Sequence, residues 1–281
     1  MSLWHDANLL WVLSGTLLLG ISAAVVGGFA VLRKRALIGD VLAHAALPGI
    51  MIAFILFETK APGLVLIAAL SSSLLGYYLI GWLTRFSKIK TDAAMAITLS
   101  FFFAIGLMAL SYIQTLEVAN KSGLDRLLFG QAAAMTQTDV IWLMAVALTV
   151  LSYIALLFHK LRIISFDPNF AQALGLKLKL YELSFALVLV VTIVIGLQIV
   201  GVVLMAAALL IPITIARFWS CQLKTLLIIA ASMSALSAII STHISLLVSN
   251  MPTGPWIVVI LGILFGVSWL VSASLRKYRH V

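Results

Sequence analysis

The distribution of apolar residues along the chain predicts a series of membrane-spanning helices. Seven apolar stretches stand between charged or turn-forming residues, and each is close to the about 20 residues that a helix needs to cross a bilayer. These stretches cover residues 9–32, 38–57, 62–84, 93–113, 138–158, 224–248 and 255–275. The pattern predicts an all-α polytopic membrane protein.

An eighth apolar stretch, from Leu183 to Ile215, contains no charged residue over 33 positions. It is too long for one ordinary span and short for two full ones. Gly196 and Gly201 flank Gln198 near its middle, and glycine favours a turn. We therefore expect two short helices here and nine spans in total; one long helix would give eight.

The composition excludes the soluble classes of protein. Of the 281 residues, 63% are hydrophobic and 10% are charged, and the mean hydropathy is +1.19. A soluble domain has about 25% charged and about 45–50% apolar residues, so a soluble enzyme, a nucleic-acid-binding domain and a disordered chain are ruled out. The one cysteine, Cys221, excludes an internal disulfide. No linker or repeat divides the chain, so residues 1–281 are interpreted as a single transmembrane domain.

Positive charge predicts the orientation, because the cytoplasmic loops of membrane proteins are enriched in Lys and Arg. In a nine-span topology, fifteen of the eighteen basic residues fall on one side, and only Lys60, Lys121 and Arg126 fall on the other. This asymmetry predicts a plasma-membrane protein with a cytoplasmic C-terminus and an external N-terminus. The net charge of +9 therefore indicates membrane orientation and not a nucleic-acid partner.

One carboxylate, that of Asp40, lies inside an apolar stretch, whereas the other eight lie at span ends or in loops. An acidic residue within a membrane helix costs on the order of 2.5–3.5 kcal/mol. His44 follows one turn later on the same face, and a carboxylate with an imidazole forms half of a divalent-cation site. Two structural alternatives remain open. Asp40 could lie near the cytoplasmic end of the helix and form an ion pair with Arg33 or Arg35, or Asp40 and His44 could simply satisfy each other's polar groups without a metal.

The longest loop predicted on the cytoplasmic side covers residues 159–182. Asp167 can cap a short helix that begins at Pro168, where the missing N–H costs nothing, and Gly175 can end it. One apolar face of this helix comprises Phe170, Ala173 and Leu174. A two-turn helix is marginal alone, so we expect it to dock, either on the membrane domain itself or on a partner.

Catalytic motifs are missing from the sequence. It contains no GxxxxGK[ST] phosphate-binding loop, no Ser/His/Asp arrangement, no CxxC and no HExxH. The chain is therefore predicted to be neither an ATPase nor an intramembrane enzyme.

Several sequence blocks resemble those of a known family. Residues 28–33 (GFAVLR) are followed by residues 36–49 (ALIGDVLAHAALPG), and the GDxLxHAxLPG pattern within them is specific. Further blocks occur in the family's order at residues 127–130, 167–175, 200–205, 208–217 and 252–255. Over nearly its whole length, the chain is similar to the permease subunit of bacterial manganese, zinc and iron ABC importers.

The resemblance implies a type II ABC importer, in which two permeases work with two cytoplasmic ATPases and an extracytoplasmic metal-binding protein. It matches Asp40 and His44 to metal contacts in the translocation pathway. It matches residues 166–176 to the coupling helix that seats in the ATPase, here Phe166, Asp167, Pro168, Phe170, Ala173, Leu174 and Gly175. Two further pathway candidates are His243, for which a hydrogen bond to a neighbouring helix is the simpler role, and Asn250, which stands where many members carry an acidic residue.

These features predict the membrane subunit of an ATP-driven metal importer that works by alternating access. The binding protein would dock on outer loops around residues 114–137 and 249–255, and a second permease copy, most simply in a homodimer, would complete the pathway. An oxygen and nitrogen ligand set without a membrane cysteine suits Mn²⁺ and tolerates Zn²⁺ or Fe²⁺. The ion is cargo, no permanently bound cofactor is expected, and ATP belongs to the partner subunit.

Two functions of other kinds compete with this prediction. An ion-coupled secondary carrier would use Asp40 as its relay and would need no ATPase, which leaves the coupling-like loop without a purpose. A membrane scaffold or receptor would keep full function after Asp40→Asn and His44→Ala.

Overall fold

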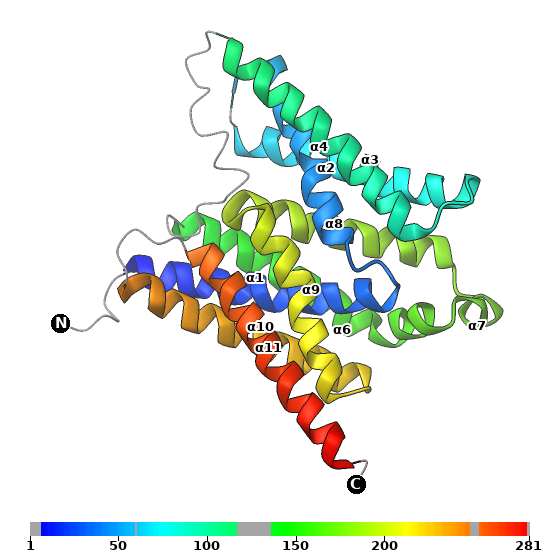
Figure 1. Ribbon diagram of the computed structural model, residues 1–281. Helices are drawn as coiled ribbons and strands as arrows, with labels where there is room; N and C mark the ends of the chain where they lie inside the picture. The colour runs from blue at the N-terminus through cyan, green and yellow to red at the C-terminus, as the bar shows by residue number, and fades with distance from the viewer. Residues whose placement is uncertain (1–6, 60, 117–135, 248–252, 280–281) are drawn as a thin grey trace. The chain divides into compact units, whose positions relative to one another are not determined.

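The structure is a computed structural model that describes residues 7–59, 61–116, 136–247 and 253–279. The elements in these ranges are all helices (Figure 1). They are α1 (Ala7–Leu32), α2 (Ile38–Phe57), α3 (Pro62–Phe86), α4 (Thr91–Thr115), α6 (Gln137–Phe166), α7 (Pro168–Ala173), α8 (Leu178–Val200), α9 (Val202–Trp219), α10 (Leu223–Leu247) and α11 (Thr253–Arg279). Within these ranges, nine helices, all except α7, are long and apolar enough to cross a membrane. The all-α prediction and the count of nine spans are confirmed.

The chain divides into two compact units, each built from separate segments of the sequence. Unit 1 contains Met1–Ala36, Gln131–Leu176 and Ala206–Val281, and unit 2 contains Leu37–Gly130 and Lys177–Met205. The division at residue 206 falls inside α9, so this helix belongs to both units. The single domain expected over residues 1–281 stays a prediction.

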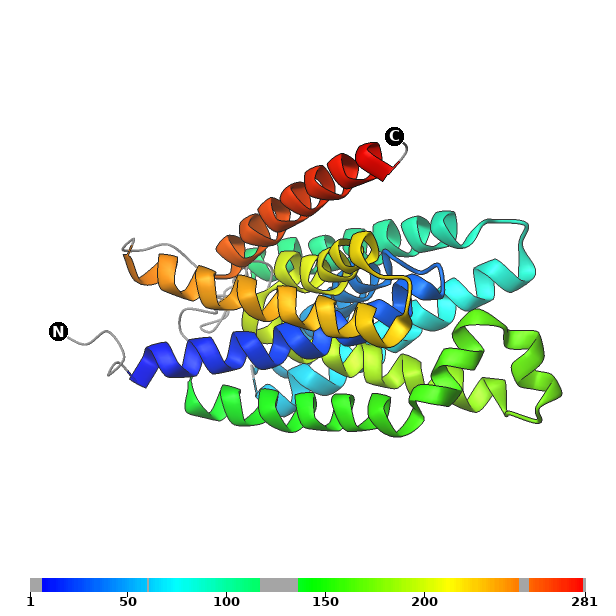
Figure 2. The same cartoon turned by 90° about the horizontal axis from the view of Figure 1, so that it is seen from below.

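In unit 1, α1 packs against both α6 and α10 (Figure 2). Glycines on α1 permit close approach to its neighbours: a Cβ on Gly27 would overlap the backbone of Leu209 in α9, and a Cβ on Gly20 would lie 2.6 Å from the Oγ of Ser234 in α10. The short α7 packs against α6, and α11 packs against α10. Helix α1 therefore fixes the packing of unit 1.

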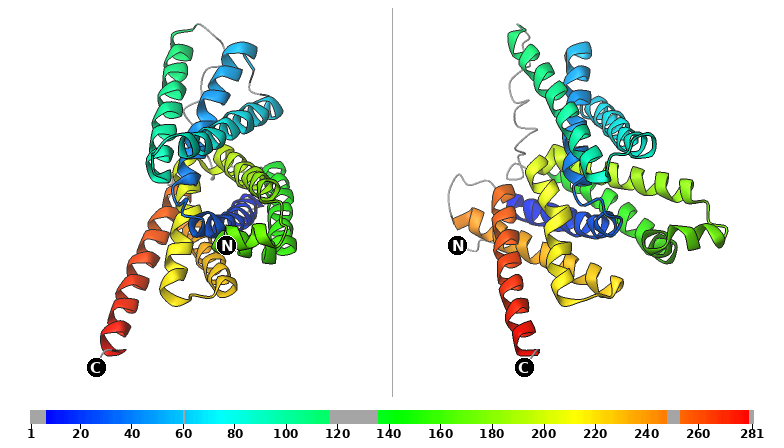
Figure 3. Two further views of the ribbon diagram at one scale, coloured as in Figure 1. Left: turned by 90° about the vertical axis from the view of Figure 1, so that its right-hand side faces the viewer. Right: turned by 45° about the vertical axis from the view of Figure 1, so that its right-hand side comes forward.

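In unit 2, α2 lies between α3 and α4 (Figure 3), and α8 packs against α2 and α3. A Cβ on Gly49 of α2 would overlap the carbonyl oxygen of Ala68 in α3, and a Cβ on Gly106 of α4 would lie 2.9 Å from the Cβ of Leu47. Most residues of α2 between Ile38 and Phe54 are buried. Helix α2 is therefore held on several sides, which fixes the orientation of any side chain it carries.

The long apolar stretch from Leu183 to Ile215 forms two helices that separate at Gly201. This glycine has φ 87° and ψ 171°, a backbone conformation that is essentially restricted to glycine. Helix α8 continues through Gly196 and Gln198, because glycine within a packed helix costs only about 1 kcal/mol. The prediction of two helices is confirmed, and the turn lies at the second of the two glycines.

The helix predicted at residues 138–158 is longer than expected, and the segment predicted as a loop at residues 159–182 is largely helical. Helix α6 continues to Phe166, and α8 already begins at Leu178. Residues 159–166 contain no glycine or proline to stop the helix. It ends where Asp167 precedes Pro168, because a following proline disfavours the helical conformation; Asp167 has φ −143° and ψ 88°.

Candidate functional site

Asp40 lies in the first turn of α2. The partial positive charge of a helix N-terminus stabilises a carboxylate there, so the full cost of an acidic residue at the middle of a membrane helix does not apply. One of the two structural alternatives predicted from the sequence also placed Asp40 near a helix end, and the position of Asp40 agrees with it. The Nε of Arg33, one of the two partners suggested for it, donates a hydrogen bond to the Oγ of Ser165 at 3.1 Å.

His44 faces Asp40 from one turn further along α2, as the spacing predicted. Its Nε2 lies 3.4 Å from the Oδ1 of Asp40, and the side chains are 19% and 36% exposed, respectively. A strong charge-assisted hydrogen bond is about 2.7–2.9 Å long, so the contact is looser than a closed ion pair. Both groups therefore keep lone pairs that a third atom can use.

Within the described part of the chain, the second ring nitrogen of His44 has no hydrogen-bond partner. Its Nδ1 is buried and unpartnered, and leaving such a group unsatisfied costs about 1–3 kcal/mol. The imidazole ring also contacts Phe103 of α4 edge-on, with the ring centroids 4.7 Å apart and the planes at 69°. A carboxylate that contacts one ring nitrogen and orients the ring is common among metal-binding histidines; in His44 the other nitrogen, Nδ1, is buried within the chain.

Two further features lie next to the pair on α2: a proline inside the helix and a hydrogen bond from α3. Pro48 lies inside the helix and has no N–H, so it cannot donate to the carbonyl of His44, four residues earlier. A backbone oxygen is thereby left without its usual helical partner beside the imidazole. Ser73 of α3 donates a hydrogen bond to the carbonyl of Leu42 at 3.0 Å, which ties α2 to α3 next to the pair.

The described residues bring together two candidate metal ligands and no third. Among the residues that the structure describes, no group of three or more His, Cys, Asp or Glu side chains could hold a metal ion. As metal ligands, Asp40 and His44 would thus lack a third side chain of these types among the described residues. A complete coordination shell needs water, backbone oxygens or another chain.

The short helix α7 has the ends that the sequence predicted. The carboxylate of Asp167 accepts a hydrogen bond from the N–H of Phe170 at 2.9 Å, and Pro168 occupies the first turn. At the other end, Gly175 has φ +77°. Its N–H bonds the carbonyl of Gln172, and the N–H of residue 176 bonds that of residue 171, which is the glycine-dependent Schellman closure.

The apolar face of α7 is exposed. Phe166, Phe170 and Leu174 are 62%, 53% and 55% exposed, and Ala173 is also exposed. In contrast, Ala171 is fully buried, and α7 packs against α6. The helix therefore docks on unit 1 by its small residue and leaves its large apolar side chains without cover.

The remaining candidates lie in unit 1 or outside the described residues. His243 lies on α10 in unit 1 and is half-buried, and Asn250 lies outside the described residues. Most of the outer loops around residues 114–137 and 249–255 also lie outside them. Sequence reasoning missed Phe103, because nothing local reveals which side chain of α4 meets a ring on α2.

Known proteins resemble the chain over most of its length. The ABC 3 transport family model matches residues 5–272. The manganese transport system membrane protein MntC of Bacillus subtilis is 40% identical over 267 residues, which are 94% of this chain and 61% of that protein. The zinc transport system membrane protein TroC of Treponema pallidum is 38% identical over 281 residues, which are 100% of this chain and 93% of that protein.

A solved structure has the same fold. PsaBC from Streptococcus pneumoniae in complex with Fab superposes with a TM-score of 0.81 at 30% identity, and the match covers 95% of this chain and 92% of that chain. The predicted type II ABC importer permease architecture is confirmed. The chain belongs to the ABC 3 transport family.

Proposed function

We propose that the chain is the membrane-spanning subunit of an ATP-driven importer of divalent transition metal ions. The observation that carries this proposal is the Asp40–His44 pair, in which a carboxylate lies 3.4 Å from an imidazole. The other nitrogen of that imidazole is buried and has no hydrogen-bond partner among the described residues. Relatives named as manganese and zinc transport proteins support a metal ion as the cargo. The ion would replace part of its hydration shell with these two side chains.

The site is completed by a second copy of the chain. Since one chain offers two ligands and no third within its described part, two copies around a two-fold axis would present two carboxylates and two imidazoles to one ion. A transport site must bind an ion well enough to admit it and weakly enough to release it. A homodimer with one shared site meets both requirements.

The energy for transport comes from a separate ATPase subunit. The chain has no phosphate-binding loop, and the exposed apolar face of Phe166, Phe170 and Leu174 offers the ATPase a surface. A closing motion of the two ATPases would move α7 and, through its contacts with α6, the membrane helices. An extracytoplasmic binding protein delivers the ion on the other side of the membrane, where Asn250 and, deeper, His243 are candidates for the pathway.

Manganese is the cargo that the ligand chemistry favours. A carboxylate, an imidazole and the carbonyl oxygen released by Pro48 form an oxygen-rich set without sulfur, and carboxylate and carbonyl ligands suit Mn²⁺. Zinc is the runner-up, because it binds more tightly than manganese at most nitrogen and oxygen sites; iron comes after it. A secondary carrier is disfavoured, because it has no use for the exposed face of α7.

Cellular metal content tests the proposal. A strain that lacks the chain is complemented with wild type, Asp40→Asn, His44→Ala or the control Asp92→Asn, which removes an exposed acid from the first turn of α4. We expect wild type and the control to restore one metal, identified by mass spectrometry, and the two site variants to fail at equal membrane expression. Restoration by both site variants would refute the site, and no metal change in any strain would refute import.

A further inference from the structure

A hydrogen bond between side chains ties the end of α1 to the end of α6 within unit 1. The Nε of Arg33 donates to the Oγ of Ser165 at 3.1 Å, and this Oγ donates in turn to the carbonyl of Leu161 at 2.6 Å. Both side chains are half-buried, whereas Lys34, the residue after Arg33, is exposed. The serine hydroxyl therefore uses its proton within α6 and accepts from the guanidinium with a lone pair.

A second contact joins the same two helices beside this hydrogen bond. The rings of Phe29 and Phe158 meet edge-on, with their centroids 6.2 Å apart and their planes at 80°, and Phe29 is fully buried. Phe29 lies four residues before Arg33 on α1, and Phe158 lies seven residues before Ser165 on α6. These spacings place each ring on the helix face that carries the hydrogen bond. One polar and one apolar contact thus hold the ends of α1 and α6 together.

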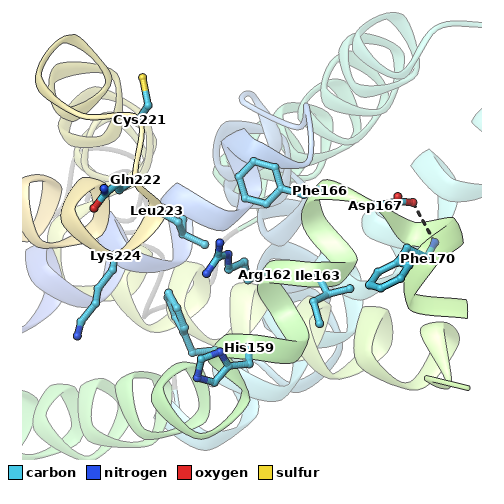
Figure 4. A pocket seen from close by; sticks show the side chains of 11 residues that line it. His159, Arg162, Ile163, Phe166, Asp167, Phe170, Cys221, Gln222, Leu223 and Lys224 are labelled. Carbon is cyan, nitrogen blue, oxygen red and sulfur yellow. Dashed lines mark hydrogen bonds between the residues drawn. The ribbon is translucent and has the colours of Figure 1, made fainter. Parts of the chain in front are cut away.

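On α6, these contacts adjoin the surface that the proposed function gives to the ATPase. Phe166 directly follows Ser165, and Figure 4 shows Phe166, Asp167 and Phe170 on the wall of one pocket at the end of α6. Phe158 lines the same pocket. A partner that covers this surface would therefore lie against one residue that contacts α1 and next to another that is bonded to it.

On α1, the contacts lead into α2 through a short connection. Residues 33–37 alone separate the two helices. The N–H groups of Lys34 and Arg35 each bond a carbonyl of the last turns of α1 at 3.0 Å, which is the Schellman closure. Lys34 adopts the left-handed φ of 58° that this closure needs, where glycine is the usual residue. A connection this short and hydrogen-bonded transmits a displacement of Arg33 to the first turn of α2, which carries Asp40.

From this arrangement we infer that Arg33 and Ser165 are positioning residues that transmit movement of the end of α6 to the metal pair on α2. The inference rests on the proposed function, which supplies the ATPase and the ion. When the ATPases move α7 and the end of α6, the hydrogen bond makes Arg33 follow Ser165, and the connection carries Asp40 and His44 with it. Chains of packed side chains and hydrogen bonds carry coupling of this kind. Without the bond, α6 moves alone, so ATP is hydrolysed without import of an ion.

The inference is tested on the full complex of the chain, its ATPase and its binding protein, reconstituted in liposomes. Initial uptake of Mn²⁺, with Zn²⁺ as the second probe, is divided by the initial rate of ATP hydrolysis to give ions imported per ATP. Arg33→Gln and Ser165→Ala each remove one side of the bond, and a double variant removes both. Ser165→Ala deletes a single oxygen, so it carries the test even where loss of the arginine impairs folding.

Two control variants are matched to these substitutions. Lys34→Gln removes an exposed charge from the position next to Arg33. Thr149→Val removes an exposed hydroxyl of α6 that also donates to a carbonyl one turn back, that of Ala145, at 2.7 Å. The conservative variant Ser165→Thr keeps the hydroxyl.

We expect Arg33→Gln and Ser165→Ala each to import about tenfold fewer ions per ATP, because each loses a hydrogen bond to a charged group. The double variant should fall no further than either single variant, since the two side chains act through one bond. Ser165→Thr and both controls should import like wild type. ATPase co-purification, ATP hydrolysis and equilibrium metal binding should stay at the wild-type level in every variant, whereas a general folding defect would lower all of them together.

Three results would overturn the inference. The first is a ratio of ions to ATP in Ser165→Ala equal to that of wild type. The second is a double variant whose loss is the product of the two single losses, because the residues would then act separately. The third is a parallel loss of metal binding or of the ATPase, which would make the contact a purely structural one. A wild type that hydrolyses ATP without importing either ion would refute the proposed function itself, and the inference with it.

Discussion

Two regions of this chain carry side chains that do not suit their surroundings: one has polar side chains on a mostly buried helix, and the other has large apolar side chains that are exposed. On α2, the polar Asp40 and His44 lie on a helix whose other positions are mostly buried. At the end of α6 and on α7, the apolar Phe166, Phe170 and Leu174 are more than half exposed. Local rules fail most often at functional sites. In the proposed function, a cation would complete the first region and a partner protein would cover the second.

The two regions also differ in how firmly the rest of the chain holds them. Helix α2 is tightly packed by its neighbours, which suits a site that must hold a defined geometry. Helix α7 has only 6 residues, and local hydrogen bonds cap both of its ends. A short helix with its own caps suits an element that a partner protein binds. Changes in the two regions should therefore have effects that can be told apart, ion binding on one side and ATPase coupling on the other.

The largest effect is expected on the α7 side. Phe170→Asp places a charge in the centre of the exposed apolar face, and loss of a central aromatic anchor weakens an interface by about 2 kcal/mol or more, about 30-fold. We expect the ATPase to dissociate and transport to stop, while metal binding at Asp40 and His44 persists. The measurement is co-purification of the ATPase from detergent.

The control for this variant is Gln172→Asp, which adds the same charge to α7 at an exposed position outside the apolar face. It should keep the ATPase bound. If both variants retain the ATPase like wild type, the apolar face of α7 has another purpose.

The next effect is expected on the α2 side. Phe103→Leu removes the ring that contacts His44 at 4.7 Å while keeping the position apolar. Groups that orient a metal ligand typically contribute 10–100-fold in affinity, so we expect about tenfold weaker metal uptake with the ATPase still bound. Uptake at low external metal measures it. Phe101→Leu, at a neighbouring exposed ring, should leave uptake unchanged, and equal loss in both variants would contradict a positioning role.

Tight packing of α2 predicts a stability effect. Gly49→Ala places a methyl group against the carbonyl of Ala68, and overpacking costs about 1–3 kcal/mol. The midpoint of thermal unfolding in detergent should fall by about 2–4 °C for each kcal/mol. Gly81→Ala, which has nothing within 4 Å, is the matched control and should not lower it. Equal midpoints for the two variants would show that α2 can shift away from α3 without loss of stability, which would contradict tight packing.

The smallest effect is expected for the cap of α7. Asp167→Ala removes the hydrogen bond to the N–H of Phe170, and loss of an N-cap costs about 0.5–2 kcal/mol. Because an ATPase partner would hold α7 in place, we expect only a few-fold loss of transport, measured as initial rate. Asp167→Asn, which can still cap, should behave like wild type. A complete loss in both variants would point to a direct contact of Asp167 with the partner.

The features that the sequence predicted well are local. Asp40 and His44 stand four residues apart, so the helix alone brings them together, and Asp167, Pro168 and Gly175 set the ends of α7 by their own backbone preferences. Apolar stretches identify spans because the bilayer fixes their length. The GDxLxHAxLPG pattern identified the family, which the family match confirms.

The features that the sequence could not predict depend on packing between helices. The contact of Phe103 with His44 joins α4 to α2. The extension of α6 to Phe166 was missed because charged residues mark the end of a span and not the end of a helix. The sequence shows Pro48 four residues after His44, so it predicts that the carbonyl of His44 lacks its helical N–H partner. Whether that carbonyl can serve as a ligand depends on the residues packed around it.

The most direct test of the central claim is the number of ions held by each pair of chains. The full-length assembly is dialysed to equilibrium against Mn²⁺, and metal and protein are counted by mass spectrometry. A site built from Asp40 and His44 of two copies predicts one ion for every two chains, lost in both Asp40→Asn and His44→Ala. One ion per chain, or an ion that survives both substitutions, would contradict it.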